Sequence, residues 1–234
     1  MSLFTISDLH LSLSIDKPMD VFGSEWDHYM ERLFENWSST VSSTDTVIVG
    51  GDVSWAMYLN ECERDFAFLN ALPGTKIILK GNHDYWWESL TKLQNYVTEK
   101  GFSTLCFLHN NAYLAEDCAI CGTRGWVDPS YESFKADDQK IYLRELARME
   151  LSLKSAAKLG AKKIIAVLHY PPITKTLTVS EQYAALFQAY GVSLCVYGHL
   201  HARASKRAFE GMAGGVEYKL AAADYMGFTP YKLT

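Results

Sequence analysis

Short apolar runs alternate with longer amphipathic stretches along this chain. Five of the runs span only five or six residues and are rich in Val, Ile and Leu. Runs this short predict buried strands, because a typical helix needs more residues. The predicted strands are Leu3–Ser7, Thr46–Gly50, Thr75–Leu79, Lys163–Leu168 and Ser193–Tyr197.

Apolar residues recur at helical spacing between these strands. The predicted helices cover Trp26–Ser38, Cys62–Leu72, Trp86–Lys100 and Asp138–Leu159, and a fifth follows the capping-box pattern Thr178-Val-Ser-Glu181 and ends before Gly191. Strands that alternate with helices predict parallel β-α-β units with right-handed crossovers. Because no linker or internal repeat divides the chain, we expect a single domain over residues 1–234.

Two regions break this alternation. The stretch 102–127 contains short strand-like pieces split at Asn110-Asn111 and Glu116-Asp117. The tail 208–233 contains similar pieces joined at Gly214-Gly215. Turn residues between short apolar pieces indicate hairpins, so we expect antiparallel strands in both regions.

Polar side chains directly follow each of the five predicted strands. They are Asp8 and His10, Asp52, then Asn82, His83 and Asp84, then His169, and finally His199 and His201. Ligands bind at the carboxyl ends of the strands in open α/β sheets. A single His or Asp in such a place is commonly structural, but five clusters at matching positions predict one shared site.

The residue types in these clusters indicate metal chemistry. Imidazoles combined with carboxylate and amide oxygens suit Mn, Fe, Zn, Ni or Co, and they differ from a thiolate zinc site or an all-oxygen calcium site. Seven candidate ligands exceed what one ion uses, while a shared carboxylate allows them to hold two divalent metal ions. Such a pair of ions can bind the attacking and leaving oxygens of a phosphoryl group.

Composition narrows the class of protein further. The chain has 48% hydrophobic residues and a formal charge of −5, which excludes a disordered chain and argues against long nucleic acid as a partner. We expect no signal peptide, no membrane span and a cytoplasmic location. Cys118 and Cys121 lie three apart in a strand-like run, so they should face opposite sides of a sheet as unconnected thiols.

The polar clusters resemble, in order and spacing, the motif series of the calcineurin-like metallophosphoesterase family. The matching residues are Asp8-Leu9-His10, Gly51-Asp52, Gly81-Asn82-His83-Asp84, His169 and Gly198-His199-Leu200-His201. The length and the Trp-rich stretches look most like a small bacterial group of predicted phosphohydrolases within it. The resemblance implies a four-layer α/β/β/α sandwich in which two mixed sheets pack face to face.

The resemblance also implies a role for each matching residue. Asp8, His10 and His201 would hold the first metal, Asp52 would bridge both metals, and Asn82, His169 and His199 would hold the second. His83 would protonate the leaving oxygen, and Asp84 would orient the His83 ring.

The chain departs from some branches of that family after Asp52. Val53 and Ser54 stand where the protein serine/threonine phosphatases carry Asp-Arg-Gly, so an arginine that clamps phosphate there is missing. Arg124 lies between glycines after a strand-like run and is the candidate replacement for binding substrate phosphate, although a structural arginine is equally compatible with the sequence. Aromatic residues near the motifs, such as Trp55, Trp126 and Tyr170, either line a pocket or belong to the core.

We therefore expect an enzyme that hydrolyses phosphomonoester or phosphodiester bonds by direct attack of a metal-bridging hydroxide. Its substrate should be a phosphorylated small molecule or a nucleotide-like compound. One alternative is a non-catalytic scaffold that keeps the metallophosphoesterase fold. Another is a nuclease acting on short nucleic-acid ends, for which the only dense basic cluster is Arg203–Arg207.

Overall fold

The computed structural model describes residues 1–21 and 23–234, and it contains two mixed β-sheets. The first sheet has the strand order β11-β1-β2-β3-β4. Its strands are β11 (Tyr231–Lys232), β1 (Leu3–Ile6), β2 (Thr46–Val49), β3 (Thr75–Leu79) and β4 (Leu105–Leu108). All neighbouring pairs are parallel except β1 with β11.

The second sheet has the strand order β5-β6-β7-β8-β10-β9. Its strands are β5 (Ala112–Ala115), β6 (Cys118–Thr123), β7 (Lys163–Leu168), β8 (Val192–Tyr197), β10 (Val216–Leu220) and β9 (Gly211–Ala213). The four central strands are parallel, and the edge strands β5 and β9 pair antiparallel with their neighbours.

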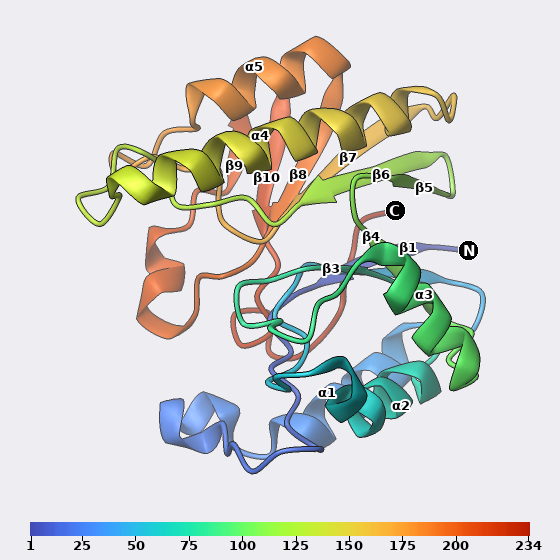
Figure 1. Cartoon of the computed structure of the whole chain (residues 1–234). Helices are drawn as coiled ribbons and strands as arrows, with labels where there is room; N and C mark the ends of the chain where they lie inside the picture. Colours follow the sequence, from blue (N-terminus) through green and yellow to red (C-terminus); the bar gives the residue numbers. More distant parts are fainter.

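Helices cover the outer face of each sheet, which gives four layers (Figure 1). The first sheet is covered by α1 (Tyr29–Thr40), α2 (Glu63–Ala71) and α3 (Leu90–Glu99), and the second by α4 (Ala136–Ala157) and α5 (Glu181–Tyr190). Short 3-10 helices are η1 (Asp20–Phe22), η2 (Ser24–Trp26), η3 (Leu59–Cys62) and η4 (Ala202–Arg207). The predicted α/β/β/α sandwich is confirmed.

Three apolar layers hold the sandwich together. The middle layer lies between the sheets and includes Ile48, Ile77, Ile120 and Val167. The outer layers lie under the helices and bury larger side chains, among them Trp37, Phe66 and Trp86 on one side and Tyr142, Tyr183 and Phe187 on the other. Burying apolar area at these three interfaces is the main favourable term that fixes the strand ends in space.

Most predicted elements are present with small shifts at their ends. The five strands and five helices predicted from the sequence all occur, although the first helix begins at Tyr29 and not at Trp26, and the third begins at Leu90 and not at Trp86. The expected antiparallel pairing is correct for β5 with β6 and for β9 with β10, but wrong for β4, which joins β3 in parallel.

Two local predictions have a clear outcome in the structure. The predicted capping box at Thr178 is wrong, because Ser180 is the N-cap of α5 and the Thr178 hydroxyl contacts Thr174. Cys118 packs between the two sheets while Cys121 packs under the helices, so the two thiols do face opposite sides. None of the helices in the described part of the chain combines the length and the hydrophobicity that a bilayer crossing requires.

The two sheets touch where β1 and β8 end. Ser7 forms an isolated bridge with Ala222, and its backbone N–H donates to the Ala221 carbonyl at 2.7 Å. A Cβ at Gly198 would lie 2.3 Å from the Ser7 Oγ atom, so only glycine allows this approach. The carboxyl ends of strands from both sheets therefore face the same region.

The contact of β6 with β7 gives a testable prediction about the fold. A Cβ at Gly122 would lie 2.3 Å from the backbone oxygen of Val167, which cannot move without breaking the sheet. We expect Gly122→Ala to lower the free energy of unfolding by about 3 kcal/mol or more in urea titrations. Gly101→Ala is the matched control, because nothing lies within 4 Å of its added Cβ and only its positive φ is unfavourable. Equal losses in the two variants would contradict the steric explanation.

Candidate metal centre

The loops after β1, β2 and β8 bring four ligand-type side chains together. Asp8, His10, Asp52 and His201 each offer one atom to a group whose atoms all lie within 4.8 Å of one another. The His201 Nε2 atom lies 3.1 Å from Asp8 Oδ1 and 3.2 Å from His10 Nε2. We call these four residues the first donor set.

The loops after β3, β7 and β8 form a second donor set of Asn82, His169 and His199. The Asn82 Oδ1 atom lies 2.7 Å from His169 Nε2 and 2.8 Å from His199 Nδ1. Asp52 belongs to the first set and also lies next to the second, because its Oδ2 atom is 3.8 Å from His10 Nε2 and 3.4 Å from His169 Nε2. The structure thus brings all seven sequence-predicted ligands to one place.

Several of these residues have a strained backbone. Four of them have φ values in the left-handed region, which residues other than glycine rarely adopt: Asp8 (62°), His10 (47°), Asp52 (51°) and His199 (71°). The loops are held in this state by backbone hydrogen bonds, including Asp8 N–H to the Gly51 carbonyl at 2.8 Å and His10 N–H to the Asp52 carbonyl at 2.9 Å. Strain that clusters at one site indicates a functional constraint on its geometry.

Asp84 is fully buried and holds two of the loops together. Its carboxylate accepts backbone N–H groups from Gly81 at 2.7 Å, Val53 at 2.8 Å and Asp52 at 2.9 Å, and the Trp86 indole N–H at 3.1 Å. The His83 Nδ1 atom has no hydrogen-bond partner in the described part of the chain. The Asp84 carboxylate therefore positions the backbone of the loops that carry Asp52 and Gly81. No hydrogen bond in the described part of the chain supports its predicted role of orienting the His83 ring.

Buried charges of opposite sign control the ionisation of the two donor sets. Burial alone would raise the pKa of Asp8 and of Asp52, but the charge of neighbouring imidazoles has a larger, opposite effect. His201 holds the pKa of Asp8 well below its ordinary value, and His169 lowers the pKa of Asp52 to about 2. Burial would lower the pKa of the two histidines, yet the carboxylates raise it to about 9 for His169 and about 10 for His201. Without cations, the site thus balances carboxylates against imidazoliums.

Hydrogen bonds at the far ring nitrogens fix the orientation of two of the imidazoles. The His169 Nδ1 atom lies 3.1 Å from the Gly50 carbonyl oxygen, and the His201 Nδ1 atom lies 3.2 Å from Asp224 Oδ1. Such partners leave Nε2 free to bind a metal. Sequence reasoning missed Asp224, although a carboxylate shortly after the strand Val216–Leu220 was a detectable signal of the same kind as the others.

Arg124, the candidate phosphate ligand, follows β6 close to the second donor set. Its carbonyl accepts the backbone N–H of His169, and its guanidinium lies over the Trp126 ring. The Arg124 Nη2 atom is 3.9 Å from the buried Glu145 carboxylate, which Arg148 contacts more closely at 2.9 Å. The side chain thus lies against a buried carboxylate, and substrate binding by Arg124 stays a prediction.

An aromatic cavity opens beside the first donor set. It has a volume of about 210 Å³ and is lined by His10, Met19, Trp26, Trp55, His83, His201 and Ala202. Trp55 stacks on the His10 ring at 4.7 Å and 22°. The indole N–H of Trp55 donates to the Met19 sulfur at 3.1 Å, which helps to fix the position of its ring.

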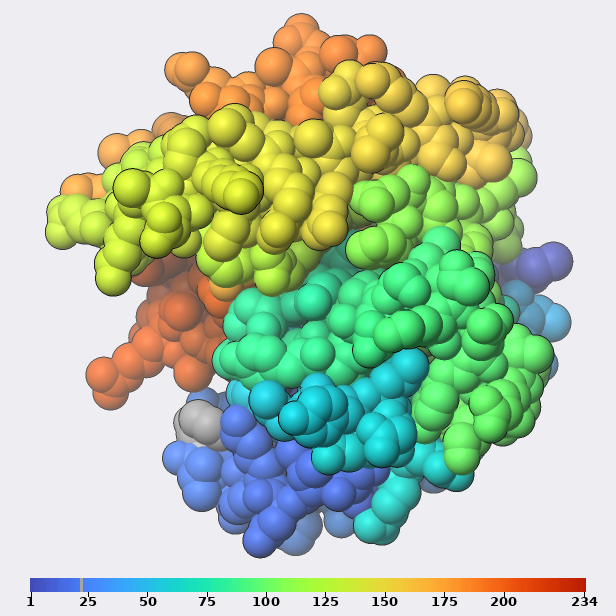
Figure 2. Space-filling view, viewed as in Figure 1, coloured from blue at the N-terminus to red at the C-terminus, as the bar shows by residue number. Residues whose placement is uncertain are grey.

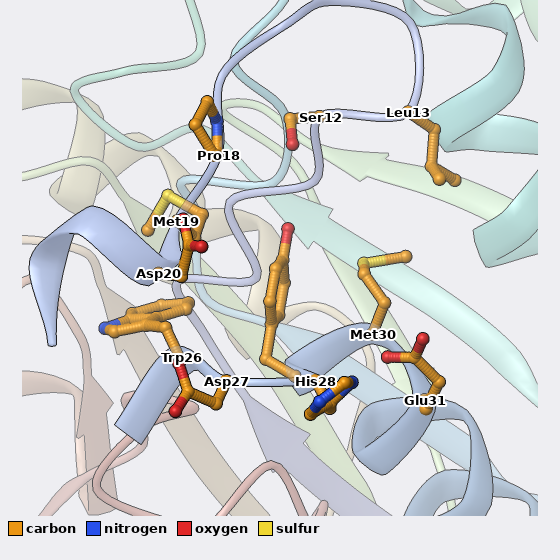
Figure 3. A pocket seen from close by; sticks show the side chains of 11 residues that line it. Ser12, Leu13, Pro18, Met19, Asp20, Trp26, Asp27, His28, Met30 and Glu31 are labelled. Carbon is orange, nitrogen blue, oxygen red and sulfur yellow. The ribbon is translucent and has the colours of Figure 1, made fainter. Parts of the chain in front are cut away.

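A larger cavity of about 520 Å³ lies next to the aromatic cavity (Figure 3). Figure 3 shows Met19 and Trp26 at one side of it and Leu13 and Met30 at the other. It shares Met19 and Trp26 with the aromatic cavity, but none of the seven ligand-type residues lines it. The larger cavity is therefore not part of the candidate metal site.

Comparisons with known proteins agree with this site. The family model described as calcineurin-like phosphoesterase matches residues 1–203, which include both donor sets. The chain belongs to the calcineurin-like phosphoesterase family. The comparison with curated proteins found no match.

Several solved structures share the fold of this family member. A protein from Thermus thermophilus has 15% identity and a TM-score of 0.60, with 99% of this chain and 97% of that chain covered. The phosphopantetheinyl hydrolase of Mycobacterium tuberculosis has 14% identity and a TM-score of 0.54, with coverages of 99% and 95%. A protein of unknown function from Aquifex aeolicus has 17% identity and a TM-score of 0.52, with the same coverages. At these identities the likeness concerns the fold.

The donor sets of this calcineurin-like phosphoesterase fit divalent metal ions. The His10 and His201 Nε2 atoms lie 3.2 Å apart, and the ligand-type atoms of His10, His201, Asp8 and Asp52 all lie within 4.8 Å of one another, close enough to share one cation. The set combines imidazole, carboxylate and amide donors, which suits first-row transition metals. Asp224 lies outside the residues that the family model matches. Its contact with His201 is therefore a feature that the structure shows and the family match does not.

We expect Asp224→Asn to weaken metal binding by about 10- to 100-fold, because the His201 ring would lose its carboxylate partner. Titration calorimetry with Mn²⁺ measures this directly. Glu210→Gln is the matched control, since Glu210 accepts from Tyr225 at 2.7 Å in the same region and touches neither donor set. Wild-type affinity in Asp224→Asn would contradict the assigned role.

Metal loading at pH 7.5 should release about two protons. His169 and His201 keep their protons below about pH 9 and about pH 10, and a metal can bind only the deprotonated rings. Apparent affinity should therefore fall as the pH is lowered from 9 to 7. Calorimetry in buffers of different ionisation enthalpy counts the protons, and heats that do not depend on the buffer would contradict the expectation.

Proposed function

We propose that this chain is a metal-dependent phosphoesterase that uses two divalent ions to hydrolyse phosphomonoesters or phosphodiesters of small molecules. Asp8, His10 and His201 would hold one ion, and Asn82, His169 and His199 the other. The observation that carries the proposal is the position of Asp52, whose Oδ2 atom lies within 4 Å of imidazole nitrogens from both donor sets. A carboxylate in that position can bridge two ions.

Two bound divalent ions would lower the pKa of water at the site and neutralise the charge on phosphate oxygens. The protein must then supply a proton to the leaving oxygen, since an alkoxide is a poor leaving group. His83 is the candidate donor, because its ring lines the aromatic cavity beside His10 and its backbone N–H donates to Asp52 Oδ1 at 2.7 Å. Burial lowers the pKa of His83, which makes its imidazolium a stronger acid.

Other residues of the site position these groups. Trp55 lies 4.7 Å from the His10 ring and 4.4 Å from the His83 ring, so it packs against both. Asp84 fixes the backbone of Asp52 and Gly81 through its hydrogen bonds. A rigid surrounding of this kind reduces the reorganisation needed in the transition state.

The complete donor set supports catalysis over a scaffold role. All seven ligand-type residues and His83 are present and converge, whereas a non-catalytic relative has no physical reason to keep so many polar groups buried. The formal charge of −5 favours a small phosphorylated substrate over long nucleic acid.

The test is turnover of p-nitrophenyl phosphate esters by protein loaded with Mn²⁺, compared with protein treated with a chelator. Hydrolysis that depends on the metal supports the function. Loaded protein that turns over neither a monoester nor a diester contradicts it.

His83→Ala should keep its metal content and lose activity mainly on esters with poor leaving groups. General acid catalysis contributes about 10²- to 10⁴-fold, so kcat for alkyl phosphate esters should fall by that factor, and less for p-nitrophenyl esters. Elemental analysis checks metal content, and the dependence of kcat on leaving-group pKa measures the effect. His28→Ala is the matched control, because His28 belongs to neither donor set. A uniform loss for all leaving groups would remove His83 from the acid role.

A further inference from the structure

The metal centre opens into two separate cavities. The tryptophan cavity is the one described above, with Met19, Trp26, Trp55 and His83 in its wall. The tyrosine cavity has a volume of about 180 Å³, and its wall includes Tyr131, Tyr170, Ile173, His199, Leu200 and Arg207. Both walls are mainly apolar or aromatic, and each contains at least one metal-ligand histidine.

Each cavity belongs to one donor set. His10 and His201 of the first set line the tryptophan cavity, and His199 of the second set lines the tyrosine cavity. The segment from His199 to Ala204 separates the two: Ala202 lines one cavity and Ala204 the other. In Figure 2 the orange-red part of the chain, which includes η4, projects between the α4 layer above and the N-terminal part of the chain below.

A phosphoryl group bound between the donor sets would have one cavity on each side. A phosphomonoester carries one organic group and needs only one cavity, whereas a phosphodiester carries two. We propose that this chain hydrolyses phosphodiesters with two apolar or planar organic groups, one in each cavity. This inference rests on the proposed phosphoesterase function.

The position of His83 decides which group leaves. His83 lines the tryptophan cavity and not the tyrosine cavity, so the alcohol in the tryptophan cavity receives the proton. Water forms a new P–O bond, and the P–O bond to that alcohol breaks with its electron pair on the alcohol oxygen. The proton from His83 neutralises this oxygen, and a proton of the water restores His83. The product monoester keeps the group in the tyrosine cavity.

The walls indicate the chemistry of the two groups. Trp26, Trp55 and Met19 offer an apolar surface to the leaving group. Tyr131 and Tyr170 line the tyrosine cavity, and Tyr170 lies 4.2 Å from the His199 ring, so the retained group meets an aromatic wall next to the second donor set. Asp128 and Arg207 add polar groups to that cavity, which suits a planar group with polar edges.

The experiment compares three substrates with the same leaving group on Mn²⁺-loaded protein: p-nitrophenyl phosphate, methyl p-nitrophenyl phosphate and phenyl p-nitrophenyl phosphate. We expect kcat/KM for the phenyl diester to exceed that for the methyl diester by about tenfold or more, because only the phenyl group fills the tyrosine cavity. Equal values for the two diesters, or a preference for the monoester over the phenyl diester, would overturn the inference.

A variant that fills the tyrosine cavity tests the assignment of the retained group. Ala204 is exposed and lines that cavity, so Ala204→Trp should bring the ratio of phenyl to methyl diester close to one. Lys206→Trp is the matched control on the same helix, because Lys206 is exposed and lines neither cavity, and it should keep the wild-type ratio. A wild-type ratio in Ala204→Trp would also overturn the inference.

Binding gives a readout that is independent of turnover. Diphenyl phosphate should bind the loaded protein more tightly than phenyl phosphate in titration calorimetry and should change tryptophan fluorescence, because one ring lies against Trp26 and Trp55. Tighter binding of phenyl phosphate would contradict the two-cavity substrate. Hydrolysis of the monoester with no preference for diesters leaves the phosphoesterase function intact and removes only this inference, whereas no hydrolysis of any ester removes both.

Discussion

The Asp8 carboxylate accepts the backbone N–H of His199 at 3.0 Å, and this buried contact joins the two sheets where β1 and β8 end. The Ser7 hydroxyl contacts the same carboxylate, and the absence of a side chain at Gly198 allows the strands to approach. The contact links two parts of the first donor set, because Asp8 and His10 come from one sheet and His201 comes from the other. The metal centre is therefore a consequence of how the two sheets meet.

The second constraint is the cost of burying so many polar groups. Asp8, Asp52 and His169 are almost fully excluded from solvent, and each is stable there only because it faces an opposite charge or a hydrogen-bond partner. Divalent cations satisfy the same groups with less need for protonated histidines. The strained φ values of Asp8, His10, Asp52 and His199 show that the protein accepts an unfavourable backbone to keep this arrangement.

Much of the fold and of the candidate site could be predicted because the signals were local. The strands at Leu3, Thr46, Thr75, Lys163 and Val192 have dense β-branched composition, and each is directly followed by the polar residues that form the site. Other features depend on contacts between distant segments. Asp224 reaches His201 only because β10 lies beside β8, and Asp84 serves backbone amides of a neighbouring loop rather than the histidine next to it in sequence. The capping box predicted at Thr178 is wrong because α5 begins at Glu181, so that Ser180 and not Thr178 is its N-cap.

By itself the sequence determined the type of chemistry: the kinds of ligand atoms, their order and their places after buried strands. These follow from residue identity and from patterns a few residues long, which act before the chain is folded. Only the tertiary structure decided that Asp84 binds backbone amides of a neighbouring loop, that Asp224 contacts His201, and that two cavities flank the donor sets. These features depend on packing between residues far apart in the chain, and no local pattern contains that information.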